Sequence, residues 1–149
     1  MNNTTPDHEL HTPVLLERTL ELLGPVLRAP GAVLVDATLG MAGHADAFLR
    51  KHPGLVLVGI DRDHDALTVA TRRLAAYADR IHLVHAIYDE LPQVLDSLGI
   101  PVADGILFDL GVSSLQLDRT ERGFAYSQNA PLDMRMDTSR DLTAERILA

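Results

Sequence analysis

The stretch VLVDATLGMAGH at residues 33–44 decides the fold of this chain. It is a short apolar run that stops at Asp36 and then passes through small residues into an expected helix. A second apolar run, LVGID at residues 57–61, stops at a carboxylate, and Asp61 follows Gly40 by 21 residues. In nucleotide-binding βαβ units an acid that binds ribose follows the glycine turn by about 20 residues. The spacing therefore predicts a site for an adenosine-containing ligand.

Each part of this pattern also has a plainer interpretation. A turn of small residues forms wherever a strand leads into a helix, and a carboxylate at a strand end often only caps a turn. Alanine stands at positions 42 and 45, where a dinucleotide fingerprint has glycine, and no P-loop lysine follows. S-adenosylmethionine has ribose and adenine but no pyrophosphate, so a looser turn suits it. Asp36 either faces the sulfonium or amino group of such a ligand or only caps the backbone.

Apolar runs alternate with helical patterns along the chain. Strands are expected over residues 32–36, 55–61, 81–85 and 105–109, and helices from Thr12-Pro13, over 43–51, after Asp63 and over 89–98. The strands are continuous apolar runs, which is typical of a parallel sheet covered on both faces. The fold class is therefore α/β, with a doubly wound sheet. In such sheets the ligand binds outside the carboxyl ends of the strands.

Polar or aromatic side chains follow each of the four expected strands. Asp36, Asp61 and Asp109 end the first, second and fourth of these strands, and Tyr88 comes just after the third. Asp109 can accept a hydrogen bond from an amino group of ligand or substrate, which makes it the candidate catalytic residue, or it can act as a cap. Tyr88 either stacks on adenine or is an ordinary half-buried aromatic. The seven histidines lack metal-ligand spacing, so we expect no metal site.

Composition limits the class of protein. The 149 residues suit one domain, and no apolar run reaches the roughly 20 residues needed to span a bilayer. Residues 1–11 are expected to be a flexible tail without the features of a signal peptide. The absence of cysteine excludes disulfides and thiol nucleophiles in this chain and suits a reducing cytoplasm, where we expect the protein. A net charge of −8 argues against non-specific binding of nucleic acid.

The chain changes character after Asp109. Residues 111–140 are polar and rich in turn residues, and a structureless loop of this length inside a domain is usually functional, so we assign it to substrate or cofactor. All five basic residues of 111–149 are arginine, which makes this segment the least unfavourable place for a polyanion. A helix is expected to start at about Leu142.

Five motifs together resemble the bacterial 16S ribosomal RNA cytosine-N4 methyltransferase family. They are HTPVLL (11–16), DATLGMAGH (36–44), DLGVSSLQLD (109–118), RGF (122–124) and PLDMRMD (131–137). The resemblance implies S-adenosylmethionine as cofactor and one cytosine of the small subunit's 16S RNA as substrate. The cofactor contacts it implies are Ala42, Gly43, His44, Asp61, Tyr88, Asp109 and Gln116.

Some features depart from the family. Ala42 stands where the family usually has glycine, and Asn129-Ala130 stands where it usually has Asp-Gly. The family chain is about twice as long, so residues 12–149 are expected to be the N-terminal part of the cofactor-binding domain, with 141–149 starting an inserted helical region. We expect this fragment alone to be inactive and its fourth strand to be an exposed edge that favours self-association. A nucleotide-dependent oxidoreductase and a non-catalytic nucleotide-binding module remain alternatives.

Overall fold

The computed structural model describes residues 12–149, and the tail predicted over residues 1–11 lies outside that part. Its four strands are parallel and form one sheet in the order β3-β2-β1-β4. The strands are β1 (Val33–Asp36), β2 (Val56–Asp61), β3 (Ile81–His85) and β4 (Gly105–Leu107). The predicted parallel sheet, with its fourth strand at an edge, is confirmed.

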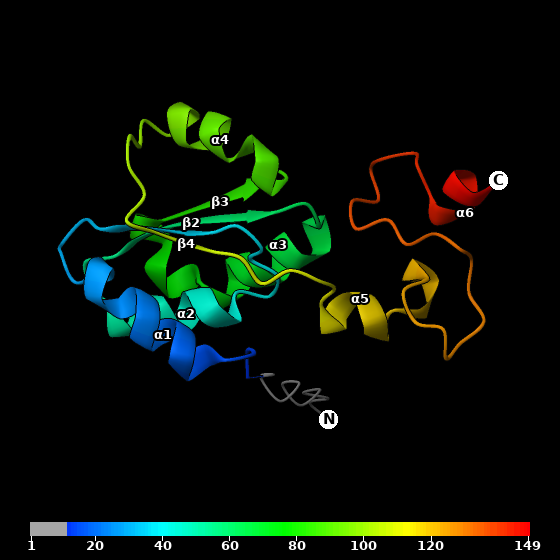
Figure 1. Cartoon of the computed structure of the whole chain (residues 1–149), viewed down its shortest axis with the longest axis horizontal. Helices are drawn as coiled ribbons and strands as arrows, with labels where there is room; N and C mark the ends of the chain where they lie inside the picture. Colours follow the sequence, from blue (N-terminus) through cyan, green and yellow to red (C-terminus); the bar gives the residue numbers. More distant parts are fainter. Residues whose placement is uncertain (1–11) are drawn as a thin grey trace, which may run out of the picture.

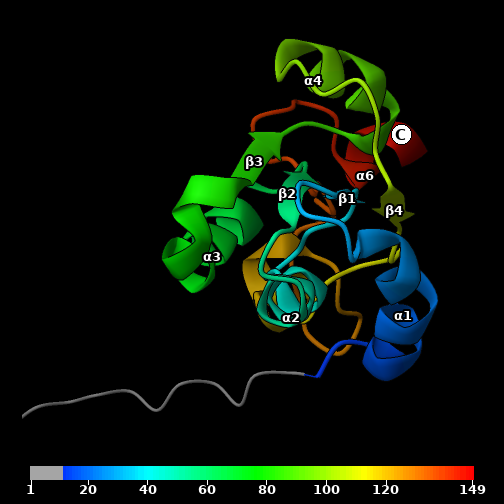
Figure 2. The same cartoon turned by 90° about the vertical axis from the view of Figure 1, so that its left-hand side faces the viewer.

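Helices connect the strands and cover both faces of the sheet. The α-helices are α1 (Leu16–Leu23), α2 (Gly43–Lys51), α3 (His64–Arg73), α4 (Leu91–Ser97), α5 (Ser114–Asp118) and α6 (Ala144–Leu148). The 3-10 helices are η1 (Gly24–Leu27), η2 (Ala75–Arg80), η3 (Tyr88–Glu90) and η4 (Thr120–Arg122). Figure 2 shows α1, α2 and α3 on one face and α4 on the other, which is the predicted doubly wound arrangement. Within residues 12–149 no helix combines the length and apolar character needed to cross a membrane.

The core lies in two layers because successive strand side chains point to opposite faces of the sheet. On one face Leu34 and Leu57 pack with Phe48 and Leu49 of α2. On the other face the core residues of the strands and of α4 are Val33, Val35, Val58, Ile60, Leu91 and Val94. Both faces of the central strands are therefore buried away from solvent, which explains why β1 and β2 are continuous apolar runs.

The expectation for the first helix is wrong in its start. Thr12-Pro13 does not cap it; α1 begins at Leu16, after Leu15 in the left-handed conformation with φ of 53°. Val14 and Leu15, which the expected helix would have included, are 64% and 72% exposed. A tertiary contact explains the late start of α1, because the segment before it packs against the start of α2 and does not continue the helix.

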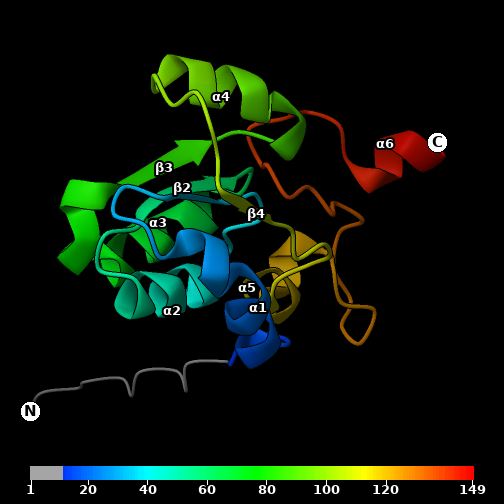
Figure 3. The ribbon, with the colours of Figure 1, turned by 60° about the vertical axis from the view of Figure 1, so that its left-hand side comes forward.

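The region after β4 also differs from expectation. The strand ends at Leu107, two residues early, because the Asp109 N–H donates to the Thr38 hydroxyl at 2.7 Å instead of continuing the ladder. Residues 111–140 contain α5 and η4, so they are not a structureless loop. The last helix begins at Ala144, two residues later than expected, with Thr143 as its cap. Figures 1 and 3 show the segment after α5 running to α6 at the periphery, beyond the carboxyl ends of the strands.

Candidate functional site

Three aspartates end neighbouring strands at the carboxyl edge of the sheet. Asp36 ends β1 and Asp61 ends β2, while Asp109 follows β4. Asp36 pairs in register with Gly59 on one side and with Leu107 on the other. Asp61 lies two residues after Gly59, and Asp109 lies two residues after Leu107. Because strand side chains alternate between the two faces, all three aspartates are expected on the same face of the sheet. The structure therefore brings together the three acids that the sequence proposed.

Asp36 is the most deeply buried of these acids. Its side chain is 2% exposed, and one carboxylate oxygen accepts a hydrogen bond from the Thr38 N–H at 3.2 Å. Burial, reinforced by the charges of Asp61 and Asp109, raises the pKa of Asp36 to about 7, although the Thr38 bond opposes the shift. Asp36 therefore changes charge near neutral pH, and a cation brought to this edge of the sheet would favour its ionised form.

Asp61 is bonded directly to the turn that precedes α2. Its two carboxylate oxygens accept hydrogen bonds from the Gly40 N–H at 2.7 Å and from the Asp63 N–H at 2.8 Å. Burial raises the pKa of Asp61, and these two bonds oppose the rise. The 21-residue spacing thus corresponds to a contact across β1 and β2. A carboxylate oxygen has two lone pairs, so each retains one for the hydroxyl of a ligand.

The turn before α2 is packed against protein. Ala42 is fully buried and has φ of 61°, a left-handed conformation that costs an alanine roughly 1–2 kcal/mol and that glycine adopts freely. A Cβ on Gly43 would lie 2.5 Å from Pro13 Cγ, so glycine is required there for packing. His44 is buried, with its Nε2 3.1 Å from the Val14 carbonyl oxygen. What remains for a ligand is the backbone, because the first N–H groups of a helix have no partner within it.

Gln116 does not face the three aspartates directly. It is buried, and its Nε2 donates to Asp63 Oδ2 at 2.9 Å. Its Oε1 accepts from the Ser113 N–H at 3.0 Å, and the Ser113 hydroxyl accepts from the Gln116 N–H in return, which forms a capping box for α5. The assignment of Gln116 to a cofactor stays a prediction, and in this structure its connection to Asp61 runs through Asp63.

Asp63 joins the region after β4 to the start of α3. Its Oδ1 caps α3 by accepting from the Asp65 N–H, and its Oδ2 accepts from both Gln116 and Arg122 at 2.9 Å. Burial raises the pKa of Asp63, but the bonds from Gln116 and Arg122 outweigh it and hold the pKa below its usual value. The sequence predicted the cap, but it contained no signal for the two long-range partners.

Arg122 anchors the segment that follows α5. Besides Asp63, its guanidinium donates to Asp65 at 3.2 Å and to the carbonyl oxygens of Arg135 and Met136 at 3.1 and 2.9 Å. The next residue, Gly123, has φ of 72°, and a Cβ there would collide with the carbonyl oxygen of residue 131. The structure therefore explains two residues of the motif RGF: the arginine is buried in a network of hydrogen bonds, and the glycine permits the left-handed turn that follows it.

An aromatic pair lies beside the acids. Tyr88 and Phe108 are 43% and 48% exposed, with ring centroids 5.8 Å apart at an interplanar angle of 81°. Solvent-exposed rings can stack on a planar base, which keeps the prediction for Tyr88 open. Phe108 was not among the predicted site residues, because its exposure just after an apolar strand could not be read from the sequence.

Among residues 12–149 no group of three or more histidine, aspartate or glutamate side chains is placed to hold a metal ion. The prediction of no metal therefore stays a prediction for the whole chain.

A separate ion pair lies in residues 131–137, where Arg135 donates to both carboxylate oxygens of Asp133 at 2.8 and 2.7 Å. These bonds lower the pKa of Asp133 to about 2.

The fold and the candidate site define a class: a doubly wound α/β protein with three aspartates at the carboxyl ends of its parallel strands, where such folds bind ligands. A model of the MraW methylase family matches residues 8–149, so the chain belongs to that family. The family resemblance found in the motifs is thereby confirmed.

Two curated relatives are both called ribosomal RNA small subunit methyltransferase H. That of Clavibacter sepedonicus is 65% identical over 141 residues, which are 95% of this chain and 44% of the relative. That of Salinispora arenicola is 68% identical over 139 residues, 93% of this chain and 37% of the relative. The chain thus spans less than half the length of either relative.

A solved rRNA methylase from Streptococcus thermophilus is 18% identical, with a TM-score of 0.45 over 60% of this chain and 49% of that one. A likeness of this size carries no argument about function.

Proposed function

We propose that the protein containing this chain transfers a methyl group from S-adenosylmethionine to the exocyclic N4 of a cytosine in 16S ribosomal RNA. The observation that carries the proposal is the group Asp36, Asp61 and Asp109 at the carboxyl edge of the sheet, in a chain of the MraW methylase family. The cofactor, the small-subunit RNA substrate and a cytoplasmic location are all part of this proposal. The division into a cofactor-binding part and a region that begins an insertion stays a prediction.

The residues at the sheet edge fit this cofactor chemically. Asp61 keeps lone pairs for ribose hydroxyls, and Asp36 is a buried acid whose carboxylate form gains from a neighbouring cation. Tyr88 offers an exposed ring for adenine. When bound, the cofactor supplies an electrophilic methyl group on a positively charged sulfur. The backbone at the start of α2 and these three side chains would hold it.

The chain's own contribution to the reaction is to position and polarise the amine. A cytosine amino group is weakly nucleophilic because its lone pair is delocalised into the ring, so orientation and electrostatics must lower most of the barrier. We assign Asp109 the role of accepting a hydrogen bond from this amino group. Asp109 is exposed and follows the edge strand β4, so a base taken out of its stack can reach it.

Two measurements test the proposal. Calorimetric titration of a longer protein that contains this chain with S-adenosylmethionine, and with NAD as a control, should show binding of the first only. A longer protein that contains this chain should methylate small ribosomal subunits and give N4-methylcytidine by nucleoside mass spectrometry. C5 methylation generally requires a cysteine for covalent attack; this chain has none, but the rest of a longer protein could supply one, so the product itself decides. Preferential binding of NAD, or 5-methylcytidine as the sole product, would overturn the assignment.

A further inference from the structure

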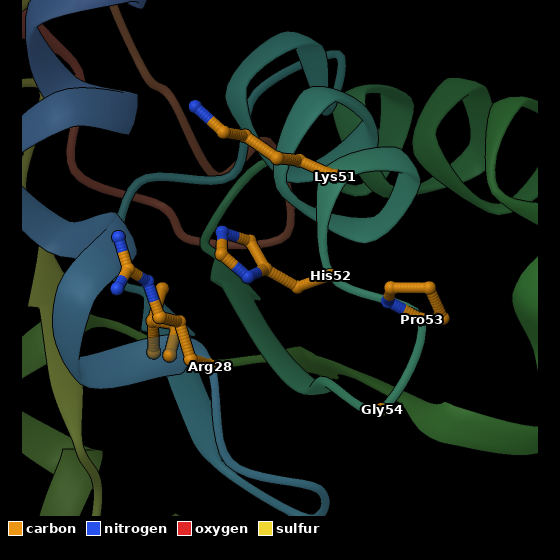
Figure 4. Close-up of a pocket in the computed structure, with 6 residues that line it drawn as sticks. Arg28, Lys51, His52, Pro53 and Gly54 are labelled. Atoms are coloured by element: carbon orange, nitrogen blue, oxygen red, sulfur yellow. The ribbon is translucent and has the colours of Figure 1, made fainter.

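A second group of polar side chains lies at the opposite end of the sheet, where the strands begin. There a pocket of about 350 Å³ opens between the ends of η1 and α2 (Figure 4). Its lining residues are Leu27, Arg28, Lys51, His52, Pro53 and Gly54. Leu27 and Arg28 lie at the end of η1, and the other four lie at the end of α2 and in the turn after it. Both places precede a strand, whereas the three aspartates lie where the strands end, so the pocket is separate from them.

The pocket is locally positive in a chain whose net charge is −8. Its lining comes from residues 27–28 and 51–54, and neither stretch contains an aspartate or glutamate. Within residues 12–149 neither Arg28 nor Lys51 takes part in an ion pair. Two cations without an acidic partner thus border one cavity, which favours an anion as its occupant.

The ordinary explanation for basic residues here is that they complement the carbonyl groups at the end of α2. Another arginine already does this. Arg80 donates to the carbonyl oxygens of Leu49, His52 and Leu55, at 2.9, 3.2 and 3.0 Å. The neighbouring Arg50 is paired with Asp46 at 2.7 Å. Of the cations around this end of α2, Arg28 and Lys51 are therefore the two left for a ligand.

His52 forms the inner wall of the pocket. It is 9% exposed, its ring stacks on Phe48 with centroids 6.3 Å apart, and its buried Nε2 has no hydrogen-bond partner in the described part of the chain. The ring points toward the space between the side chains of Arg28 and Lys51 (Figure 4). A buried polar atom without a partner is unfavourable by roughly 1–3 kcal/mol, so this nitrogen needs a partner that the described residues do not supply.

We propose that Arg28, Lys51 and His52 form a phosphate-binding site. The guanidinium and the ammonium group donate to the phosphate oxygens from two sides, and the same anion supplies a partner for the Nε2 of His52. The phosphate belongs either to a free phosphoester or to the backbone of the RNA. The second source rests on the proposed function, and it would give a chain with an acidic surface one defined cationic contact with its substrate.

Burial and the charges of Lys51 and Arg28 lower the pKa of His52, so a bound anion should raise that pKa again. The test is an NMR titration, with inorganic phosphate at constant ionic strength, of a longer protein that contains this chain; it follows the His52 ring and the amides of residues 28 and 51. We expect saturable shifts. Affinity should fall about tenfold or more in Arg28→Gln and in Lys51→Gln, since each removes a charge-assisted hydrogen bond.

The matched control is Arg50→Gln, which removes one positive charge at the residue next to Lys51. The Arg50 side chain is 64% exposed and is already paired with Asp46. Its phosphate affinity should equal that of the unchanged chain, and the amide spectrum shows whether each variant is folded. Equal losses in Arg50→Gln and Lys51→Gln, or shifts that never saturate, would overturn the site. A short single-stranded oligoribonucleotide that displaces phosphate identifies an RNA backbone as the source, and failure to displace identifies a free phosphoester. Binding of S-adenosylmethionine is measured in parallel, so that failure of this site is distinct from failure of the proposed function.

Discussion

The guanidinium of Arg122 lies 2.9 Å from the carboxylate of Asp63, with only 6% and 3% of the two side chains exposed. This buried ion pair links the segment after β4 to the start of α3. Asp63 also donates its backbone N–H to Asp61, so the pair lies one bond away from the proposed ribose contact. A buried pair stabilises less than its geometry suggests, but breaking one partner leaves an uncompensated charge that is costly.

We therefore expect Arg122→Met to detach residues 119–137 from α3. The loss of one partner of a buried pair should lower the local stability by about 3–5 kcal/mol. The measurement is amide hydrogen exchange at Met134, whose N–H donates to the Arg122 carbonyl oxygen. The control is Arg119→Met, because Arg119 and its partner Asp65 are 41% and 46% exposed and should contribute no more than about 1 kcal/mol. Equal exchange in the two variants would show that Arg122 does not anchor this segment.

The buried acid Asp36 should make the protein less stable as pH rises. Its pKa is raised from the usual value to about 7, so its protonated form favours folding below pH 4 and this contribution is lost between about pH 4 and 7. Asp36→Asn should therefore be more stable than the unchanged chain at pH 8, by a few kcal/mol at most, and similar to it at pH 4. Denaturant unfolding across this range measures the difference. A constant difference at all pH values would mean that Asp36 does not titrate there.

The pKa of Asp36 also predicts a proton change on ligand binding. If the cationic cofactor binds near this carboxyl, the carboxylate form is favoured, and binding at pH 6.5 should release a fraction of a proton. Calorimetry in two buffers of different ionisation enthalpy measures that release, which Asp36→Asn should abolish. Proton release of the same size in the variant would assign the effect to another group.

In a longer protein that contains this chain, Asp61→Ala should weaken binding of S-adenosylmethionine by roughly 1–3 kcal/mol, the range for a charged hydrogen bond. Calorimetry on the folded variant measures the change. Asp96→Ala is the matched control, because Asp96 is an exposed acid on α4. An affinity that is unchanged in Asp61→Ala, with the fold intact, would remove Asp61 from the site.

The edge strand β4 should make the isolated 149-residue chain marginally stable or self-associating, and inactive in methyl transfer. Ile106 on this strand is 43% exposed, and an open apolar edge pairs readily with another chain. Ile106→Lys should lower the mass seen by light scattering at high concentration. Val102→Lys, at a 64% exposed position outside the strand, serves as control. A monomeric chain that melts cooperatively and methylates small subunits would contradict the prediction.

Much of the sheet was predictable because its information is local. The helix Gly43–Lys51 and the strand Ile81–His85 match their expected bounds, and the cap at Asp63 is as expected. Apolar runs and turn residues act over a few positions, so a sequence displays them directly. The start of α1 was not predictable, because packing of Pro13 against Gly43 overrides the local capping pattern.

The sequence by itself determined the alternation of strands and helices, the family, and the three acids at strand ends, because these depend on neighbouring residues and short spacings. Only the tertiary structure decided that Gln116 and Arg122 meet on Asp63, and that Arg28 and Lys51 border one pocket with His52. Such contacts join residues far apart along the chain. Their energies depend on burial, which removes competing water and makes a charge require its partner, and burial exists only once the whole chain is packed.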